Sequence, residues 1–104
     1  MDAEPLADAR PGDTLHLVRA RVLAVHPTRP FRRKDGSTGF VAEVDLEDAS
    51  GRARVTLWDE AVRAAQALAA GGSAEMTDLL AKERDGRLEL HSTRATRVAV
   101  LRMG

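Results

Sequence analysis

The stretch that decides the fold is residues 29–58, which read RPFRRKDGSTGFVAEVDLEDASGRARVTLW. It opens as a basic loop with one aromatic residue. Two segments follow in which apolar and polar side chains alternate, residues 40–47 and residues 52–58, and a Ser50-Gly51 turn joins them. Such alternation is typical of half-buried strands, and a tight turn between two of them favours an antiparallel pair.

The alternation also predicts which side chains face the core. The expected inward residues are Phe40, Ala42, Val44 and Leu46 in the first segment, and Ala53, Val55 and Leu57 in the second. The second segment then exposes Arg52, Arg54, Thr56 and Trp58, the last being the only tryptophan. The sequence therefore predicts an aromatic residue beside arginines on a polar sheet face.

The first segment carries three acidic residues on its polar face, namely Glu43, Asp45 and Glu47. Two interpretations are open. The carboxylates form a metal site, or they form a solvated acidic face that keeps nucleic acid off the wrong side of the barrel. We favour the second.

A long, bent strand is expected before this pair, at residues 13–25. Its alternation changes parity between Leu17 and Val18, which indicates a bulge or a strong bend. A first strand that serves two parts of a curled sheet would need such a bend. Pro27 and Pro30 then end the strand.

One helix and two more strands are expected after Trp58. Asp59 is a suitable N-cap for an alanine-rich helix at residues 61–70, which a Gly-Gly pair ends. The fourth strand is expected at residues 73–81 and the fifth at residues 87–92. The last apolar residues either extend the fifth strand or pair back onto the sheet, and they are Val98, Val100 and Leu101.

This order of elements is that of an OB-fold: an all-β protein with one short helix, in which a five-stranded, partly open Greek-key barrel carries the helix between strands 3 and 4. A generic small β-barrel or sandwich is the alternative, but it would not need the helix. The length of 104 residues is that of one domain. We expect an acidic lead-in at residues 1–12 and a single OB-fold domain at residues 13–104.

The composition excludes several classes of function. The chain has no cysteine, so it has no disulfide, no thiolate zinc site and no cysteine nucleophile. Its three histidines, His16, His26 and His91, have no metal-ligand spacing and are expected at the surface. No catalytic motif is present, so we expect no enzyme, no cofactor and no metal. The sequence shows neither the pattern of a signal peptide nor an apolar run long enough to span a membrane. We therefore expect the cytoplasm as the location and no membrane partner.

Charge is balanced overall but sorted along the chain. Lys and Arg number 16 and so do Asp and Glu, so the net basic excess of many nucleic-acid binders is absent. Residues 29–34 nevertheless hold four basic residues and no acid. Such a cluster can create a local positive field on a neutral protein. Arg32, Arg33 and Lys34 are therefore candidates for a phosphate clamp.

Three pieces of sequence in the same order resemble the OB domains of archaeal replication protein A and archaeal single-stranded DNA-binding proteins. They are Phe31-x-x-Lys34-Asp35-Gly36-Ser37-x-Gly39, Leu46-x-Asp48-x-Ser50-Gly51, and Arg54-Val-Thr56-Leu57-Trp58-Asp59-Glu60. The resemblance covers about residues 15–92. It implies a groove that holds a single strand, with Trp58 as the stacking aromatic, Arg54 as a backbone contact, and Arg29 and Phe31 as basic and aromatic positions of the first loop.

The resemblance has one departure. The family usually has a second sheet aromatic near the tip of the last hairpin, where this chain reads Arg84-Asp85-Gly86-Arg87-Leu88. The guanidinium plane of Arg87 is the substitute for stacking. Lys82, Arg84 and Arg87 are further candidates for phosphate contacts, although the neighbouring acids Glu83 and Asp85 reduce the local positive charge. The zinc module found in many archaeal replication protein A chains is not expected without cysteine.

The expected function is non-catalytic, largely sequence-independent binding of single-stranded DNA in replication, repair or recombination. The nucleic-acid-binding residues would be Arg29, Phe31, Arg32, Arg33, Lys34, Arg52, Arg54, Thr56, Trp58, Lys82, Arg84 and Arg87. The alternative is an OB-fold interaction or structural module in a larger replication, repair or RNA-binding assembly, with other OB-fold subunits as partners. Each aromatic residue also has a structural interpretation of its own, in which Trp58 covers the helix that follows and Phe31 anchors its loop in the barrel mouth.

Overall fold

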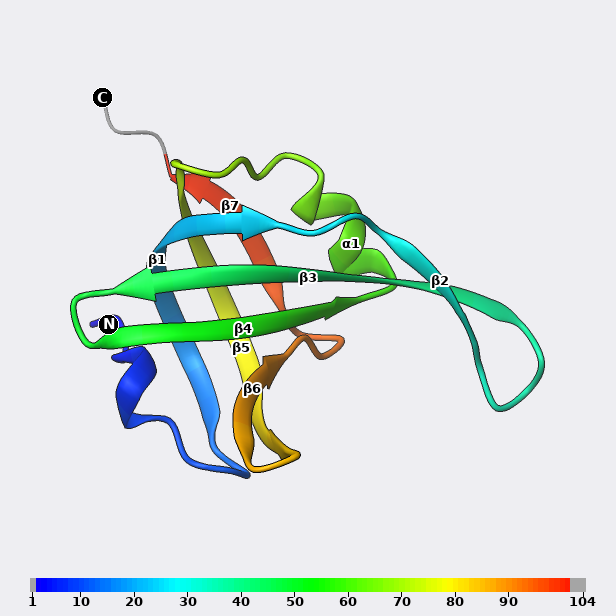
Figure 1. Cartoon of the computed structure of the whole chain (residues 1–104), viewed down its shortest axis with the longest axis horizontal. Helices are drawn as coiled ribbons and strands as arrows, with labels where there is room; N and C mark the ends of the chain where they lie inside the picture. The colour runs from blue at the N-terminus through cyan, green and yellow to red at the C-terminus, as the bar shows by residue number, and fades with distance from the viewer. Residues whose placement is uncertain (1, 102–104) are drawn as a thin grey trace.

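The computed structural model describes residues 2–101 and contains one curled sheet, one short α-helix and a single 3-10 turn (Figure 1). The elements in chain order are η1 (Leu6–Asp8), β1 (Thr14–Val25), β2 (Arg29–Arg32), β3 (Thr38–Asp48), β4 (Gly51–Trp58), α1 (Glu60–Ala65), β5 (Ser73–Arg84), β6 (Arg87–His91) and β7 (Arg97–Leu101). No helix within these residues is long and apolar enough to cross a membrane.

The strands form the barrel of an OB-fold, as predicted. The sheet order is β1-β3-β4-β6-β5-β7, and an additional β1–β5 pairing closes the ring. All pairings are antiparallel except that of β4 with β6, which is parallel. The barrel strands are β1, β3, β4, β5 and β6, so α1 lies between the third and fourth of them. The two further strands are β2, which pairs only with β3, and β7, which pairs back onto β5.

The predicted bend of the first strand is confirmed. β1 pairs with β5 from Thr14 to Arg21 and with β3 from Arg21 to Val25, so one strand serves two sides of the barrel. A register shift lies between Val22 and Ala24. The shift does not lie at the parity change itself, because β1 pairs with β5 in one unbroken register across Leu17 and Val18. These two neighbours are both buried although they point to opposite sides of the strand.

Apolar side chains from every barrel strand fill the interior. Among the most deeply buried are Val18, Val44, Leu46, Val55, Leu57, Met76, Leu79 and Leu90. The short lead-in also contributes, because Leu6 is only 2% exposed and belongs to the same cluster. Asp48 holds it there by accepting a hydrogen bond from the backbone N–H of Leu6 at 2.9 Å. A second bond, from the N–H of Ala7 to Ser50 Oγ at 3.0 Å, helps to hold η1 beside the β3–β4 turn, at the left of Figure 1.

Phe40 corrects the predicted core. Its side chain is 50% exposed, whereas its neighbour Val41 is buried. At this point β3 has left the barrel and pairs with β2, with Phe40 opposite Pro30. Phe40 is on the same side of β3 as the core residues Val44 and Leu46, but at Phe40 this side faces solvent.

The helix is shorter than the predicted span of residues 61–70. It ends at Ala65, and backbone bonds from Ala67 to Ala64 and from Leu68 to Ala65 continue it as tighter turns. These turns still bury Leu68, so the predicted apolar side is kept. Asp59 precedes the helix but makes no side-chain cap hydrogen bond, because its carboxylate is used elsewhere.

Candidate nucleic-acid interface

A two-stranded arm, formed by β2, the turn at residues 33–37 and the start of β3, projects from one end of the barrel (Figure 1). The side chain of Asp35 shapes the turn by accepting hydrogen bonds from the N–H and hydroxyl of Ser37 at 2.9 and 2.6 Å. These bonds lower the pKa of Asp35. Gly39 lies where a Cβ atom would come within 2.6 Å of the Phe31 ring, so only glycine lets this ring pack against the strand.

An aromatic cluster lies where the arm meets the barrel, and it consists of Phe31, Trp58 and His91. The Phe31 and Trp58 rings meet edge to face, with centroids 5.0 Å apart. The Trp58 and His91 rings lie nearly parallel, 6.0 Å apart at an interplanar angle of 23°. Phe31 and Trp58 are both half-buried, so each residue is partly exposed to solvent. The predicted loop anchor and the predicted stacking residue are thus in contact with each other.

Hydrogen bonds fix the orientation of Trp58. Its backbone N–H donates to Ser92 Oγ at 2.8 Å, and its indole Nε1–H donates to His91 Nδ1 at 3.1 Å. An indole N–H can only donate, so Nδ1 of His91 must be the accepting, unprotonated nitrogen. Nε2 of His91 then carries the proton and faces Glu89 Oε1 at 3.2 Å. His91 is buried, contrary to the expectation that it is a surface residue.

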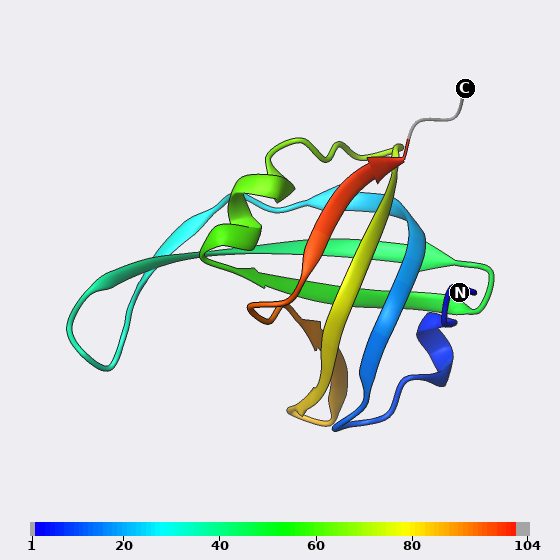
Figure 2. The ribbon, with the colours of Figure 1, turned by 180° about the vertical axis from the view of Figure 1, so that it is seen from behind.

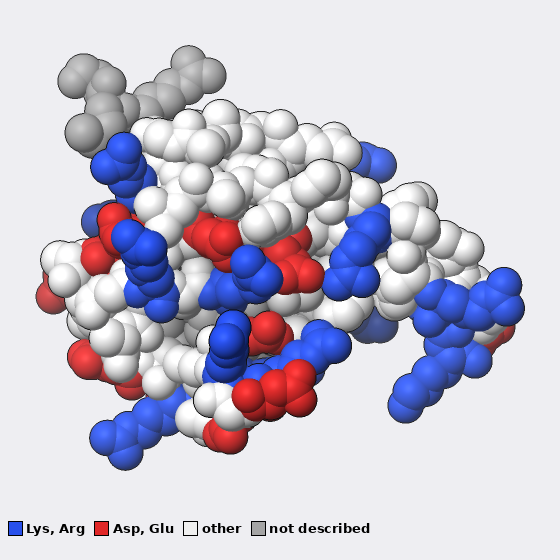
Figure 3. Space-filling view, viewed as in Figure 1, with Lys and Arg blue, Asp and Glu red and all other residues white. Residues whose placement is uncertain are grey.

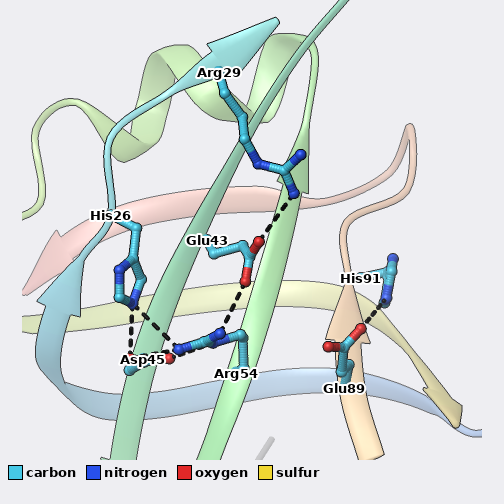
Figure 4. A network of polar contacts seen from close by, with 7 residues as sticks. All are labelled: His26, Arg29, Glu43, Asp45, Arg54, Glu89 and His91. Atoms are coloured by element: carbon cyan, nitrogen blue, oxygen red, sulfur yellow. Dashed lines mark hydrogen bonds and ion pairs between the residues drawn. The ribbon is translucent and has the colours of Figure 1, made fainter. Parts of the chain in front are cut away.

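A network of ion pairs covers the outer face of β3 and β4 (Figure 4). Glu43 accepts from Arg29 at 3.1 Å and pairs with Arg54 at 3.2 Å. Arg54 also donates to Asp45 at 2.8 Å, and Asp45 contacts His26 at 2.9 Å. The hydrogen bond from Arg54 holds the pKa of the Asp45 carboxyl below its usual value and raises the pKa of Arg54.

This network corrects the prediction of a separate acidic face. The antiparallel register places Asp45 opposite Arg54 and Glu47 opposite Arg52, so acids and arginines share one face of the sheet. Glu47 accepts from Arg52 at 2.7 Å. Within residues 2–101, no three His, Asp or Glu side chains are grouped so that they could hold a metal ion.

Thr56 corrects a second prediction about this face. Its side chain is only 4% exposed, although it was expected on the solvent side beside Trp58. β6 explains the difference, since it runs parallel to β4 and places His91 opposite Thr56. The face is therefore covered at this point, and Thr56 is buried under neighbouring side chains.

The β5–β6 turn borders the outer face of β3 and β4 at the end opposite the arm. The cross-strand pairs Arg84–Arg87 and Lys82–Glu89 lie on the side of this hairpin that carries His91. Lys82, Arg84 and Arg87 are exposed, and none of them forms an ion pair with another described residue. Arg87 also lines a shallow depression together with Arg52 and Arg54. The structure thus brings the predicted basic residues of three different strands together.

The basic run of the arm divides between two sides. Arg33 turns toward the aromatic cluster, where its guanidinium lies 5.7 Å from the Phe31 ring centroid and pairs with Asp59. Arg32 is opposite Thr38 in the register, on the side of the arm that carries Phe40. Lys34 lies in the exposed turn at the tip. The three residues therefore do not form one clamp as they stand.

The surface of this face is hollowed between the arm and the barrel, and basic side chains appear on both sides of the hollow (Figure 3). Acidic side chains lie among them in the centre of the face. A single strand laid across it would meet the partly exposed Phe31 and Trp58 and cations at either side. It would also meet the carboxylates of the ion-pair network.

Sequence analysis missed three residues near Trp58. They are His91, which supports the indole, and Arg94 and Arg97, which line a hollow beside it. The alternation of the fifth strand placed His91 on the outer side, but only the parallel pairing with β4 shows what covers it. Arg94 and Arg97 carry no sequence signal, since they lie in and after a loop whose path the sequence does not predict.

The closed five-stranded barrel with its helix and open outer face defines the chain as an OB-fold protein. No family model matches the sequence. Replication factor A of Methanothermobacter thermautotrophicus is 46% identical over 46 residues, which are 44% of this chain and 6% of that protein. The chain thus spans only a small part of that relative.

Two solved structures extend the similarity to the whole fold. The second OB-fold domain of replication protein A from Methanococcus maripaludis superimposes with a TM-score of 0.80 at 25% identity, over 97% of this chain and 96% of that one. A replication protein A heterotrimer bound to single-stranded DNA matches with a TM-score of 0.77 at 18% identity, over 94% of this chain and 24% of that one. In sequence and in fold, the chain resembles the OB domains of archaeal replication protein A.

Proposed function

We propose that this chain is a non-catalytic module that binds single-stranded DNA with little sequence preference. The observation that carries the proposal is the partly exposed pair of Phe31 and Trp58 on an open sheet face bordered by arginines. Every base offers a flat face that stacks on an aromatic ring, so stacking does not select a sequence. Basic side chains along the same path would neutralise the phosphates.

The similar proteins also support binding of single-stranded DNA. The matched heterotrimer was solved with single-stranded DNA, and the matched archaeal proteins are replication factors. By this proposal the chain acts in DNA replication, repair or recombination, in the cytoplasm, and its partners are single-stranded DNA and other OB-fold subunits. RNA remains an alternative ligand, because stacking and phosphate contacts do not by themselves distinguish the two.

Affinity should be modest. Stacking contributes about 1–3 kcal/mol per base, and only one pair of rings is available on this face. Arg29, Arg52 and Arg54 each already pair with a carboxylate, and a phosphate would have to compete with it. We therefore expect dissociation constants on the order of micromolar for this chain alone.

A second candidate function is that of an interaction or structural module in a larger assembly. The ion-pair network is the observation that favours it, because arginines that are neutralised by Glu43 and Asp45 present little net positive charge. The net charge of zero also favours an interaction module, because nucleic-acid binders usually carry a net positive charge.

A fluorescence titration distinguishes the two functions. Trp58 is the only tryptophan, so its emission reports on its own environment. The protein would be titrated with oligo-dT, oligo-rU and duplex DNA at two salt concentrations. We expect quenching by oligo-dT that weakens with salt and is absent with duplex. If oligo-dT causes no quenching at tens of micromolar protein, the interaction module becomes the better account.

A further inference from the structure

A second hollow opens next to Trp58, lined by residues of β4, α1 and the β6–β7 connection but not by Phe31, and we call it the Arg94 groove. Its volume is about 710 Å³, which falls within the range of roughly 300–1,000 Å³ for small-molecule sites. One wall is formed by the end of β4 and the start of α1. The other wall is formed by residues 92–97, the connection between β6 and β7, which lies below α1 in Figure 2.

The connection between β6 and β7 is held in one shape. The hydroxyl of Thr96 donates to the backbone carbonyl of Asp78 on β5 at 2.8 Å, and the hydroxyl of Thr93 approaches the same carbonyl at 3.3 Å. Thr96 Oγ1 also accepts the backbone N–H of Thr93 at 2.8 Å, and Thr93 Oγ1 accepts that of Ala95 at 3.1 Å. Thr96 is buried, so its two bonds are partly shielded from water, whereas the two bonds made by Thr93 Oγ1 lie at the surface. Arg94 therefore sits on a rigid turn.

The same connection is tied directly to the stacking residue. Ser92 Oγ accepts the backbone N–H of Trp58 at 2.8 Å, and the N–H of Ser92 donates to the carbonyl of Thr56 at 2.9 Å. Trp58 and Arg94 thus belong to one fixed unit. A ligand that contacts both would not have to order the loop, which removes part of the usual cost of binding.

The charges of the groove favour an anion on the Arg94 side. Arg94 and Arg97 are both exposed, and neither pairs with a carboxylate among residues 2–101. On the opposite wall, the carboxylate of Asp59 is already paired with Arg33. Glu60 is the acid that remains, and it lies at the start of α1.

We propose that a single strand stacked on Trp58 continues into the Arg94 groove, where Arg94 and Arg97 contact its phosphates. This inference rests on the proposed function and adds a nucleotide subsite to it. The groove lies outside the face formed by β3, β4 and the arm. The bound strand would therefore turn around Trp58 and leave the sheet between α1 and the β6–β7 connection.

The double variant Arg94→Ala/Arg97→Ala tests this path. Its binding to a labelled oligo-dT of about 12 nucleotides, within the roughly 4–16 that one OB-fold covers, would be measured by anisotropy at several salt concentrations. Loss of two phosphate contacts should weaken binding by about fivefold or more and reduce the log–log salt slope by about 1.4. Circular dichroism would confirm that the variant is folded, as expected for two exposed residues.

The matched control is Arg10→Ala/Arg19→Ala, which removes two exposed arginines, one before β1 and one on β1, that line neither the Arg94 groove nor the interface. It should leave the salt slope within about 0.3 of wild type. If the Arg94/Arg97 variant has the wild-type slope while wild type binds oligo-dT, the groove is overturned and the proposed function stands. If wild type does not bind, both are overturned.

Discussion

Glu43 is the residue that most controls the charge of the candidate interface. Its two carboxylate oxygens contact Arg29 and Arg54, which come from β2 and β4. A single acidic side chain therefore neutralises cations from two strands at once (Figure 4). A phosphate that binds either arginine must first displace this carboxylate or accept its repulsion.

Replacing Glu43 with Gln should strengthen the binding of oligo-dT. The amide keeps the shape of the side chain but removes the negative charge, and exposed ion pairs of this kind are worth about 0.2–1 kcal/mol. The expected gain in affinity is roughly two- to fivefold at low salt, measured by anisotropy.

Glu75→Gln is the control for this change, because it removes a similar partner from Arg19, on β1 and β5. It should leave affinity unchanged. Equal affinity of Glu43→Gln and wild type would show that the arginines of this network do not contact the nucleic acid.

At the scale of the element, the arm is the part that sets the two functional rings against each other. Its two strands place Arg32 and Arg33 on opposite sides, although they are neighbours in the chain. The guanidinium of Arg33 lies over the Phe31 ring and pairs with Asp59, whereas Arg32 lies on the side of Phe40. Arg33 therefore supports the aromatic cluster, whereas Arg32 faces away from it.

Arg33→Ala should weaken oligo-dT binding by about two- to tenfold, because it removes a hydrogen-bonded ion pair worth about 0.5–1.5 kcal/mol and leaves Asp59 unpaired near the stacking rings. Arg32→Ala removes the same charge from the other side of the arm and should change affinity by less than about twofold. Anisotropy with both variants checks this. A larger loss with Arg32→Ala would mean that the strand crosses the arm on the Phe40 side.

The sequence predicted the elements well where the signal is local. The Ser50-Gly51 turn indicated the β3–β4 pair. The bend of β1 was expected, but its register shift lies between Val22 and Ala24 and not at the parity change between Leu17 and Val18. The predicted burial of a side chain was wrong where a strand changes the strand with which it pairs. Phe40 keeps its place in the alternation, but β3 has left the barrel there, and Thr56 is buried because distant β6 lies beside it.

The mixing of acids and arginines was available from the sequence but was missed. A tight turn fixes the register of the strands that it joins. Counting back from Ser50-Gly51 places Asp45 opposite Arg54, so these residues had to share a face. By contrast, the contact of His91 with Trp58 and the path of residues 92–97 depend on closure of the barrel, which no local pattern specifies.

At the scale of the whole molecule, barrel closure assembles the interface from parts that are far apart in sequence. β2 contributes Phe31, β4 contributes Trp58 and β6 contributes His91, and their rings meet only because β4 lies between β3 and β6. The net charge of zero fits this arrangement, since local pairs balance most of the arginines of the face. Binding by such a surface should depend more on stacking than on overall charge.

The most direct test of the account is the affinity of Trp58→Ala for labelled oligo-dT, measured by anisotropy, with circular dichroism to confirm the fold. Stacking of about 1–3 kcal/mol per base predicts a loss of about tenfold or more, while Trp58→Phe, which keeps an aromatic face, should lose much less. Phe40→Ala, which removes an exposed ring from the other side of β3, should bind like wild type. If folded Trp58→Ala binds as tightly as Phe40→Ala, bases do not stack on Trp58 and the central claim is contradicted.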